Sequence, residues 1–234
     1  MSDEALFAHY VAFRRVSIPR RNEALWVGEG SLPPVASGDL GTVLPEVLAK
    51  SDGSVELRGS YNCEGFRPDV DLLLWMTSRS VEALQSTYVS LRKTFTGAAL
   101  EPSHIFLGVV RPPEFNPDHM PAFAKGEPPR RYICVYPFVR TAEWYLMDSA
   151  RRAELLREHG QMGREFPEVL TNTTSGFGLG DWEWILAFES DDLIKIVDCI
   201  RRLRDAEARR FTKLDTPFVV GIRKPLEQIL EEVG

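Results

Sequence analysis

His159 is the residue in this sequence whose surroundings favour chemistry most clearly. It stands near the end of a helix-like run at 150–160, and helical spacing places Leu155, Leu156 and Met162 one turn away from it. A neutral imidazole on an apolar helical face can ligate the iron of a haem. A histidine that simply packs in the core would give the same pattern, so spacing alone leaves both readings open.

A strand-like run at 132–140 carries a second group of candidates, because Tyr136 and Arg140 stand four residues apart in it. Side chains alternate along a strand, so both should face the same side. A tyrosine beside an oxidised haem can lose an electron and a proton, and an arginine suits a carboxylate. Trp144 and Trp184 fall in the same half of the chain, although aromatic residues more often fill a core.

The segment 112–131 contains six prolines and also His119. This composition is typical of an ordered loop or a linker. The flanking Met120 and nearby apolar residues favour a loop that folds back over a pocket. An exposed loop histidine is the alternative.

Composition excludes several classes of protein. The 234 residues are 44% hydrophobic and 26% charged, which is ordinary for a globular protein with a sizeable core. A formal net charge of -6 argues against nucleic acid or an anionic membrane surface as a general partner. The arginines between 201 and 210 are either a solvated helix face or a local site for carboxylates.

Three well-separated cysteines, Cys63, Cys134 and Cys199, show no spacing typical of a metal site. They are expected to be buried free thiols in a reducing compartment. No run approaches the length of a membrane span, and the first residues do not resemble a signal peptide, so a cytoplasmic protein is expected. The sequence has no dinucleotide-binding glycine motif, no P-loop and no serine nucleophile motif.

The C-terminal half predicts the order βαββαβ. Its elements are expected at 132–139 (strand), 149–163 (helix with Asp148 or Ser149 as N-cap), 168–177 and 182–190 (strands), 191–210 (helix) and 217–223 (strand). The apolar stripe of the last helix is expected to comprise Leu193, Ile196, Val197, Ile200 and Leu203.

The N-terminal half shows a similar order of elements. Strands are expected at 7–16, 55–63, 70–77 and 103–110, with a helix at 80–96. The first helix of this half should lie within 20–50, where only 44–49 shows a helical fragment. The sequence therefore predicts an α+β protein of two ferredoxin-like halves, 1–111 and 132–234, joined by the loop 112–131.

Several motifs together resemble one known family, the chlorite-dismutase-like haem proteins, and most closely the coprohaem decarboxylases of the actinobacterial type. The resemblance covers nearly the whole chain. The motifs that carry it are Arg-Gly-Ser-Tyr (58–61), Asp-Val-Asp-Leu-Leu-Leu-Trp (69–75), Phe-Asn-Pro-Asp-His-Met-Pro (115–121), Val-Tyr-Pro-Phe-Val-Arg (135–140), Trp-Tyr-Leu (144–146), His-Gly-Gln-Met-Gly-Arg (159–164), Gly-Leu-Gly-Asp-Trp-Glu-Trp-Ile-Leu-Ala-Phe-Glu (178–189) and Thr-Pro-Phe (216–218).

The resemblance implies a fold and a set of site residues. The fold would be the dimeric α/β barrel, with two ferredoxin-like halves per subunit and five subunits in a homopentamer. His159 would be the proximal iron ligand, Tyr136 the tyrosine that becomes a radical, and His119 the distal base for iron-bound peroxide. The substrate would be held by Arg140, Trp144, Trp184 and, on a looser match, Arg209.

The implied reaction is oxidative decarboxylation of iron coproporphyrin III (coprohaem), which is both substrate and cofactor, to haem b with hydrogen peroxide. A transient contact with a coproporphyrin ferrochelatase is a further implied partner. Chlorite dismutation is the competing activity, but the expected strand at 168–176 lacks the arginine found there in those enzymes. A haem or porphyrin carrier on the same fold is a third alternative, which would need His159 but neither His119 nor Tyr136.

Overall fold

The fold is described from a computed structural model, which describes residues 5–15, 46–48, 50–51, 53–94, 100–112, 114 and 120–233. The N-terminal half comprises β1 (Phe7–Arg15), β2 (Val55–Arg67), β3 (Val70–Ser78), α2 (Val81–Arg92) and β4 (Leu100–Val109). The short 3₁₀ helix η1 (Ala122–Lys125) follows. The C-terminal half comprises β5 (Tyr132–Arg140), α4 (Ala142–Leu146), α5 (Ser149–Gly163), β6 (Leu170–Ser175), β7 (Trp184–Ser190), α6 (Leu193–Leu203), η2 (Glu207–Phe211), β8 (Thr212–Leu214), β9 (Val219–Arg223) and α7 (Leu226–Val233).

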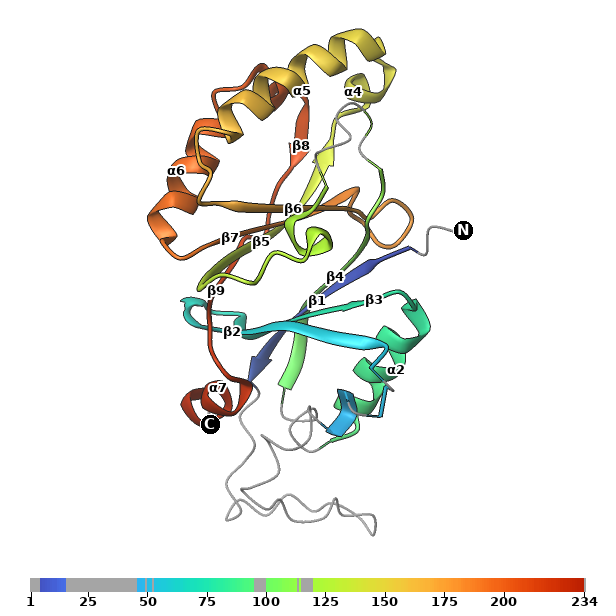
Figure 1. The fold of residues 1–234 in the computed structure, drawn as a ribbon, viewed down its shortest axis with the longest axis vertical. Helices are drawn as coiled ribbons and strands as arrows, with labels where there is room; N and C mark the ends of the chain where they lie inside the picture. Colours follow the sequence, from blue (N-terminus) through green and yellow to red (C-terminus); the bar gives the residue numbers. More distant parts are fainter. Residues whose placement is uncertain are drawn as a thin grey trace.

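The strands close into one antiparallel barrel. Their order is β7-β6-β4-β1-β3-β2-β9-β5-β8, and an additional pairing of β7 with β5 closes a ring of eight strands that leaves β8 outside. Within the ring, β4-β1-β3-β2 and β6-β7-β5-β9 are two four-stranded units with equivalent connections. The expected pair of ferredoxin-like sheets is thus confirmed, and Figure 1 shows the two halves one above the other.

Three apolar layers hold this arrangement together. The barrel interior is filled by side chains of both halves, among them Tyr10, Trp75 and Val135. On the outer face of the N-terminal sheet, α2 and α7 pack through residues such as Leu84 and Ile229. On the outer face of the C-terminal sheet lie α5 and α6 (Figure 1), and the stripe of α6 packs there.

Several expected boundaries are accurate because local signals set them. α5 spans the expected 149–163, and the Asp148 carboxylate caps it by accepting a hydrogen bond from the Ala150 N–H at 2.9 Å. α6 begins after Asp192, whose carboxylate accepts from the Ile194 N–H.

Other expectations were wrong. The helix expected to reach residue 210 ends at Leu203, so Arg209 lies on the 3₁₀ segment η2. Val197, expected in the buried stripe, is exposed. The short elements α4 and β8 were not expected, and both depend on tertiary contacts: Trp144 of α4 packs on Ala208, and β8 pairs with β5. In the N-terminal half, residues 46–48 are helical, while most of the expected first helix lies outside the described residues.

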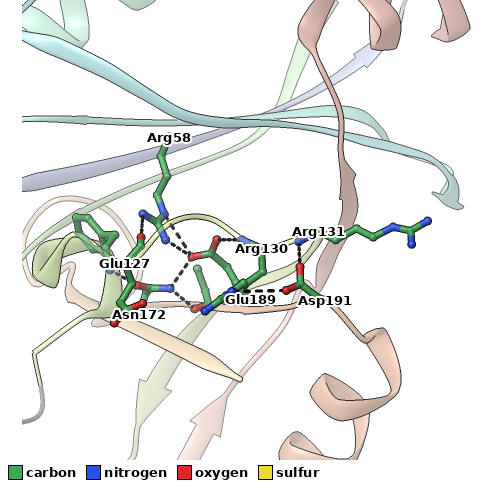
Figure 2. Close-up of polar contacts among 9 residues, drawn as sticks. Arg58, Glu127, Arg130, Arg131, Asn172, Glu189 and Asp191 are labelled. Atoms are coloured by element: carbon green, nitrogen blue, oxygen red, sulfur yellow. Dashed lines mark hydrogen bonds and ion pairs between the residues drawn. The ribbon is translucent and has the colours of Figure 1, made fainter. Parts of the chain in front are cut away.

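One buried polar network ties the two halves (Figure 2). The Arg58 guanidinium of β2 donates to Glu189 Oε1 of β7 at 2.7 Å, and both side chains are almost completely buried. Asn172 Nδ2 of β6 donates to the same Glu189 oxygen at 3.0 Å, and the Arg130 N–H donates to Oε2 at 3.1 Å. Arg58 also donates to the Glu127 carbonyl at 2.9 Å. The ion pair therefore links β2, β6, β7 and the loop that leads into β5.

None of the helices among the described residues is long and apolar enough to cross a membrane.

Removing one partner of the Arg58–Glu189 pair should destabilise the protein strongly. Arg58→Met leaves the Glu189 carboxylate buried without its counter-ion, and we expect a loss of roughly 3–5 kcal/mol in the free energy of unfolding. The double variant Arg58→Met/Glu189→Leu should lose clearly less than the sum of the two single variants. Urea denaturation measures these values.

The exposed Arg14–Glu101 pair, 2.7 Å apart, provides the matched control. Arg14→Met should cost no more than about 1 kcal/mol, as is typical of surface ion pairs. Equal losses from Arg14→Met and Arg58→Met would contradict the account of the network.

His9 of β1 should make the fold sensitive to mild acid. Burial lowers the pKa of its imidazole from 6.5 to about 4. Between pH 6.5 and 4, His9 therefore binds a proton in the unfolded chain but not in the folded protein. The free energy of unfolding should fall by up to about 3 kcal/mol over this range. In His9→Gln, unfolding free energies measured across this range should decline less steeply than in the wild type, and parallel profiles would refute the assignment.

Candidate functional site

A cavity of about 340 Å³ lies on the helix-covered side of the C-terminal sheet, and it is the candidate functional site. Strands β5, β6 and β7 supply one wall, and α5, α6 and η2 supply the other. The residues that line it are Arg111, Pro112, Glu114, Pro121, Tyr136, Phe138, Arg140, Trp144, Leu156, His159, Thr173, Ser175, Trp184, Leu186, Phe188, Ile200, Leu203, Arg204, Ala208, Arg209, Thr212 and Asp215. Every described residue proposed from the sequence for the site is among them.

His159 reaches the cavity from the last turns of α5. Its neighbour Leu156, one turn earlier, also lines the cavity, while Leu155 is buried against Trp144. The half-buried imidazole is therefore at the boundary between an apolar wall and the open volume. A histidine in this placement can ligate the iron of a bound haem.

Tyr136 lies on the opposite wall, in the middle of β5. Its ring packs against Phe218 at 4.6 Å and Phe188 at 5.8 Å between centroids. Burial, followed by the nearby Cys134 thiol, raises the pKa of the Tyr136 phenol well above its usual value. The phenol thus keeps its proton at neutral pH and can serve as a hydrogen-atom donor.

Arg140 is a fixed cation at the end of the same strand. Its Nη1 donates to the Ala208 carbonyl at 2.7 Å, and the guanidinium carbon lies 4.0 Å from the Trp144 ring centroid. Phe138 stacks on it as well, at 4.6 Å. Burial lowers the pKa of Arg140 to about 10, which still leaves it charged at neutral pH. The expected common face of Tyr136 and Arg140 is confirmed, since both line the cavity.

A second cationic group was only partly anticipated. Arg209 Nη1 donates to Asp215 Oδ2 at 2.7 Å, and Arg204 Nη1 donates to the same oxygen. A site for carboxylates was one of two readings of the arginines between 201 and 210, which include Arg204, but nothing in the sequence pointed to Asp215. Asp215 stands in a polar segment eleven residues beyond Arg204, and only the turn through η2 and β8 brings it back.

The walls also carry aromatic and small polar side chains. Trp144 is buried beneath Arg140, and Trp184 lines the cavity from the first residue of β7. Strand β6 contributes only the small hydroxyls of Thr173 and Ser175. The sequence of this strand contains no arginine or lysine.

His119 lies outside the described residues, so its expected place over the pocket stays a prediction. The described residues on either side of it do border the cavity, namely Pro112, Glu114 and Pro121. Both ends of this loop therefore reach the site.

Comparison of the sequence with known proteins identifies the family to which this chain belongs. Residues 40–224 match the family described as chlorite dismutase. A coproheme decarboxylase from Mycolicibacterium smegmatis is 43% identical over 208 residues, which cover 85% of this chain and 90% of that protein.

Solved structures resemble the fold over nearly its full length. A double mutant of chlorite dismutase from Candidatus Nitrospira defluvii superimposes with a TM-score of 0.80 at 22% identity, covering 97% of this chain and 95% of that one. The same organism's chlorite dismutase in complex with imidazole gives 0.74 at 20% identity, covering 100% and 96%. At these identities the structures establish the fold alone.

Proposed function

Because the chain belongs to the chlorite dismutase family, we propose that it is a coprohaem decarboxylase that makes haem b with hydrogen peroxide as oxidant. In this reaction two propionates of iron coproporphyrin III become vinyl groups, in the last step of coproporphyrin-dependent haem biosynthesis. One observation carries the proposal: His159, Tyr136 and Arg140 line the same cavity from opposite walls.

The side chains of the cavity fit a porphyrin. Among the described residues, no group of three or more His, Cys, Asp and Glu could hold a bare metal ion. His159 offers a single nitrogen ligand, which is what an iron already held by a porphyrin needs. Leu156, Leu186 and Trp184 supply apolar wall for the macrocycle.

The arginines fit the carboxylates of such a substrate. The Ala208 carbonyl and the Trp144 ring hold the Arg140 guanidinium in place, so its other N–H groups stand in fixed positions. Arg209 and Arg204 are held together by Asp215. We assign one propionate to Arg140 and another to the Arg209 group, since guanidinium groups bind carboxylates in a fixed fork.

Tyr136 is assigned the hydrogen transfer. The bound iron porphyrin supplies peroxide-driven oxidation chemistry in this site. Tyr136 gives up its phenolic hydrogen and then takes a hydrogen atom from the β-carbon of a propionate. The carbon radical then loses one further electron to the oxidant that hydrogen peroxide supplies, and its carboxylate leaves as carbon dioxide. One peroxide thus accepts the two electrons that each vinyl group requires. The phenol of Tyr136 is buried beside Phe188 and Phe218 and is neutral. It can therefore lose one hydrogen atom and regain it in each cycle.

His119 is assigned the role of base toward peroxide. With an ordinary pKa of about 6.5, a histidine can accept a proton from peroxide near neutral pH. The assignment is supported by Pro112, Glu114 and Pro121, which bring both ends of its loop to the cavity.

Chlorite dismutation is the weaker candidate. Strand β6 faces the cavity with Thr173 and Ser175, and it carries no arginine or lysine that could hold chlorite. A carrier would need His159 and the cavity, but it would not need the phenol of Tyr136 on the cavity wall.

The direct test incubates the protein with coprohaem, adds hydrogen peroxide, and identifies the products by chromatography and mass spectrometry. The proposal expects haem b, formed with the loss of two carboxyl groups. The same loaded protein should release little dioxygen from chlorite. Intact coprohaem after peroxide, or sustained dioxygen release, would overturn the assignment.

Assembly and location complete the proposal. We infer a homopentamer in the cytoplasm, with a transient contact to a coproporphyrin ferrochelatase. The three cysteines are all free and buried, which suits a reducing compartment.

Replacing His159 by Ala should remove the iron ligand. We expect the ferric spectrum of the coprohaem-loaded protein to change, because the iron would lose the ligand that the protein supplies. His104→Ala is the control, since His104 lies on β4 and pairs with Asp69 at 3.0 Å. An unaltered spectrum in His159→Ala would contradict the assignment.

Tyr136→Phe should bind coprohaem and consume peroxide yet form haem b roughly 10²–10⁴-fold more slowly, the range for losing a positioned group that moves a proton. The ring volume is kept and only the hydroxyl is removed. Tyr132→Phe is the matched control, because Tyr132 stands four residues earlier on β5 and packs in the same cluster. Haem b formed at the wild-type rate by Tyr136→Phe would assign the hydrogen transfer to another residue.

A further inference from the structure

A line of aromatic side chains leads from the cavity to the protein surface. Trp184 lines the cavity, and the Phe177 ring stands edge-on to it at 5.4 Å between centroids. The Tyr145 ring stands edge-on to Phe177 at 5.9 Å. Tyr145 is 39% exposed and is not among the described residues that line the cavity.

Tyr145 also lies beside Trp184. The indole N–H of Trp184, which can only donate, lies near enough to the Tyr145 hydroxyl to lower the pKa of that phenol. One step therefore joins the wall of the cavity to a tyrosine at the surface.

The Tyr145 phenol has a proton acceptor in place. Its hydroxyl donates to Glu183 Oε2 at 2.6 Å, the length of a charge-assisted hydrogen bond. Glu183 is itself held, because the same oxygen accepts from the Arg140 backbone N–H at 2.7 Å. Burial and the Glu183 carboxylate raise the pKa of Tyr145, so the phenol is neutral at neutral pH.

This geometry suits loss of an electron coupled to loss of a proton. A neutral phenol that loses an electron becomes a strong acid, so its oxidation is easy only where a base waits on the hydroxyl. Glu183 provides that base without any movement. Tyr136 is placed differently, inside the cavity wall between phenylalanine rings.

We propose that Tyr145 is a second redox-active tyrosine, which carries surplus oxidising equivalents from the cavity to the surface with Glu183 as its proton acceptor. The inference rests on the proposed function for its oxidant, hydrogen peroxide. The electron leaves Tyr145 by way of Trp184 toward the oxidised centre in the cavity. The O–H bond of Tyr145 breaks, and its proton forms an O–H bond on Glu183. A small one-electron reductant of the enediol or phenol class returns the electron at the exposed edge, and Glu183 returns the proton.

The experiment traps the radical and locates it. Protein loaded with haem b, which is not a decarboxylation substrate in the proposed reaction, receives hydrogen peroxide and a nitroso spin trap, and tryptic peptides are then sequenced by tandem mass spectrometry. The three tyrosines of interest fall in separate peptides: Tyr145 in 141–151, Tyr136 in 132–140 and Tyr88 in 80–92. We expect a trap adduct on Tyr145, and we expect added ascorbate to suppress it.

Two variants and a control decide the roles. Tyr145→Phe should abolish the adduct on 141–151, which also separates Tyr145 from the neighbouring Trp144. Glu183→Gln keeps the phenol but removes the base, and should reduce the Tyr145 adduct by roughly a hundredfold, the lower end for a positioned proton acceptor. Tyr88→Phe, on α2 in the other half, should leave the adduct unchanged.

Absence of an adduct on Tyr145 while the loaded protein consumes peroxide would overturn the inference. An undiminished adduct in Glu183→Gln would overturn the role of the carboxylate. Failure of the proposed function is seen separately, as coprohaem that binds but yields no haem b, and it leaves the result for Tyr145 to stand by itself. A protein that shows no haem absorption band after loading would contradict both.

Discussion

The buried ion pair between Arg58 and Glu189 is the interaction on which the rest of the structure depends. A buried ion pair stabilises a protein only if its geometry is good and hydrogen-bond partners meet its remaining oxygens and N–H groups. Here they are met by Asn172, by the Arg130 N–H and by the Glu127 carbonyl (Figure 2). An alternative packing of the two halves would leave a carboxylate buried alone, so the network specifies one docking of the halves.

This constraint reaches the site through β7 and the incoming loop. Glu189 and Trp184 lie near opposite ends of β7, and Trp184, Leu186 and Phe188 of this strand line the cavity. Asn172 Oδ1 accepts from the Phe123 N–H at 2.8 Å, which fixes the segment just after Pro121. The same polar network therefore sets the position of one wall and of the loop that borders it.

The two halves share a topology but not a site, and packing explains the difference. On the N-terminal sheet, the apolar faces of α2 and α7 fill the outer surface with side chains such as Leu91 and Leu230. On the C-terminal sheet, α5 and α6 leave a volume lined by Tyr136 and by arginines that carbonyl and carboxylate oxygens hold in place. Fixed cations around an apolar cavity attract a flat, apolar molecule that carries carboxylates at its edge.

Local patterns predicted what local forces determine. The bounds of α5, its cap at Asp148 and the common face of Tyr136 and Arg140 follow from helical and strand periodicity. Glu189 was not singled out, because a carboxylate at the end of a strand gives the same local pattern whether it is exposed or buried. Asp215 and the short elements α4 and β8 were missed for a related reason, since only tertiary pairing defines them. The roles proposed for His159 and Tyr136 were suggested by residue spacing and by family resemblance, and the structure brings these two residues to one cavity.

The central claim is that this cavity holds the porphyrin between His159 and the Tyr136 wall. A crystal structure of the protein with coprohaem tests it most directly. The account predicts iron bonded to a nitrogen of His159, the Tyr136 hydroxyl beside a propionate, and Arg140 on a carboxylate. Iron without a bond to His159, or a porphyrin seated outside this cavity, would contradict it.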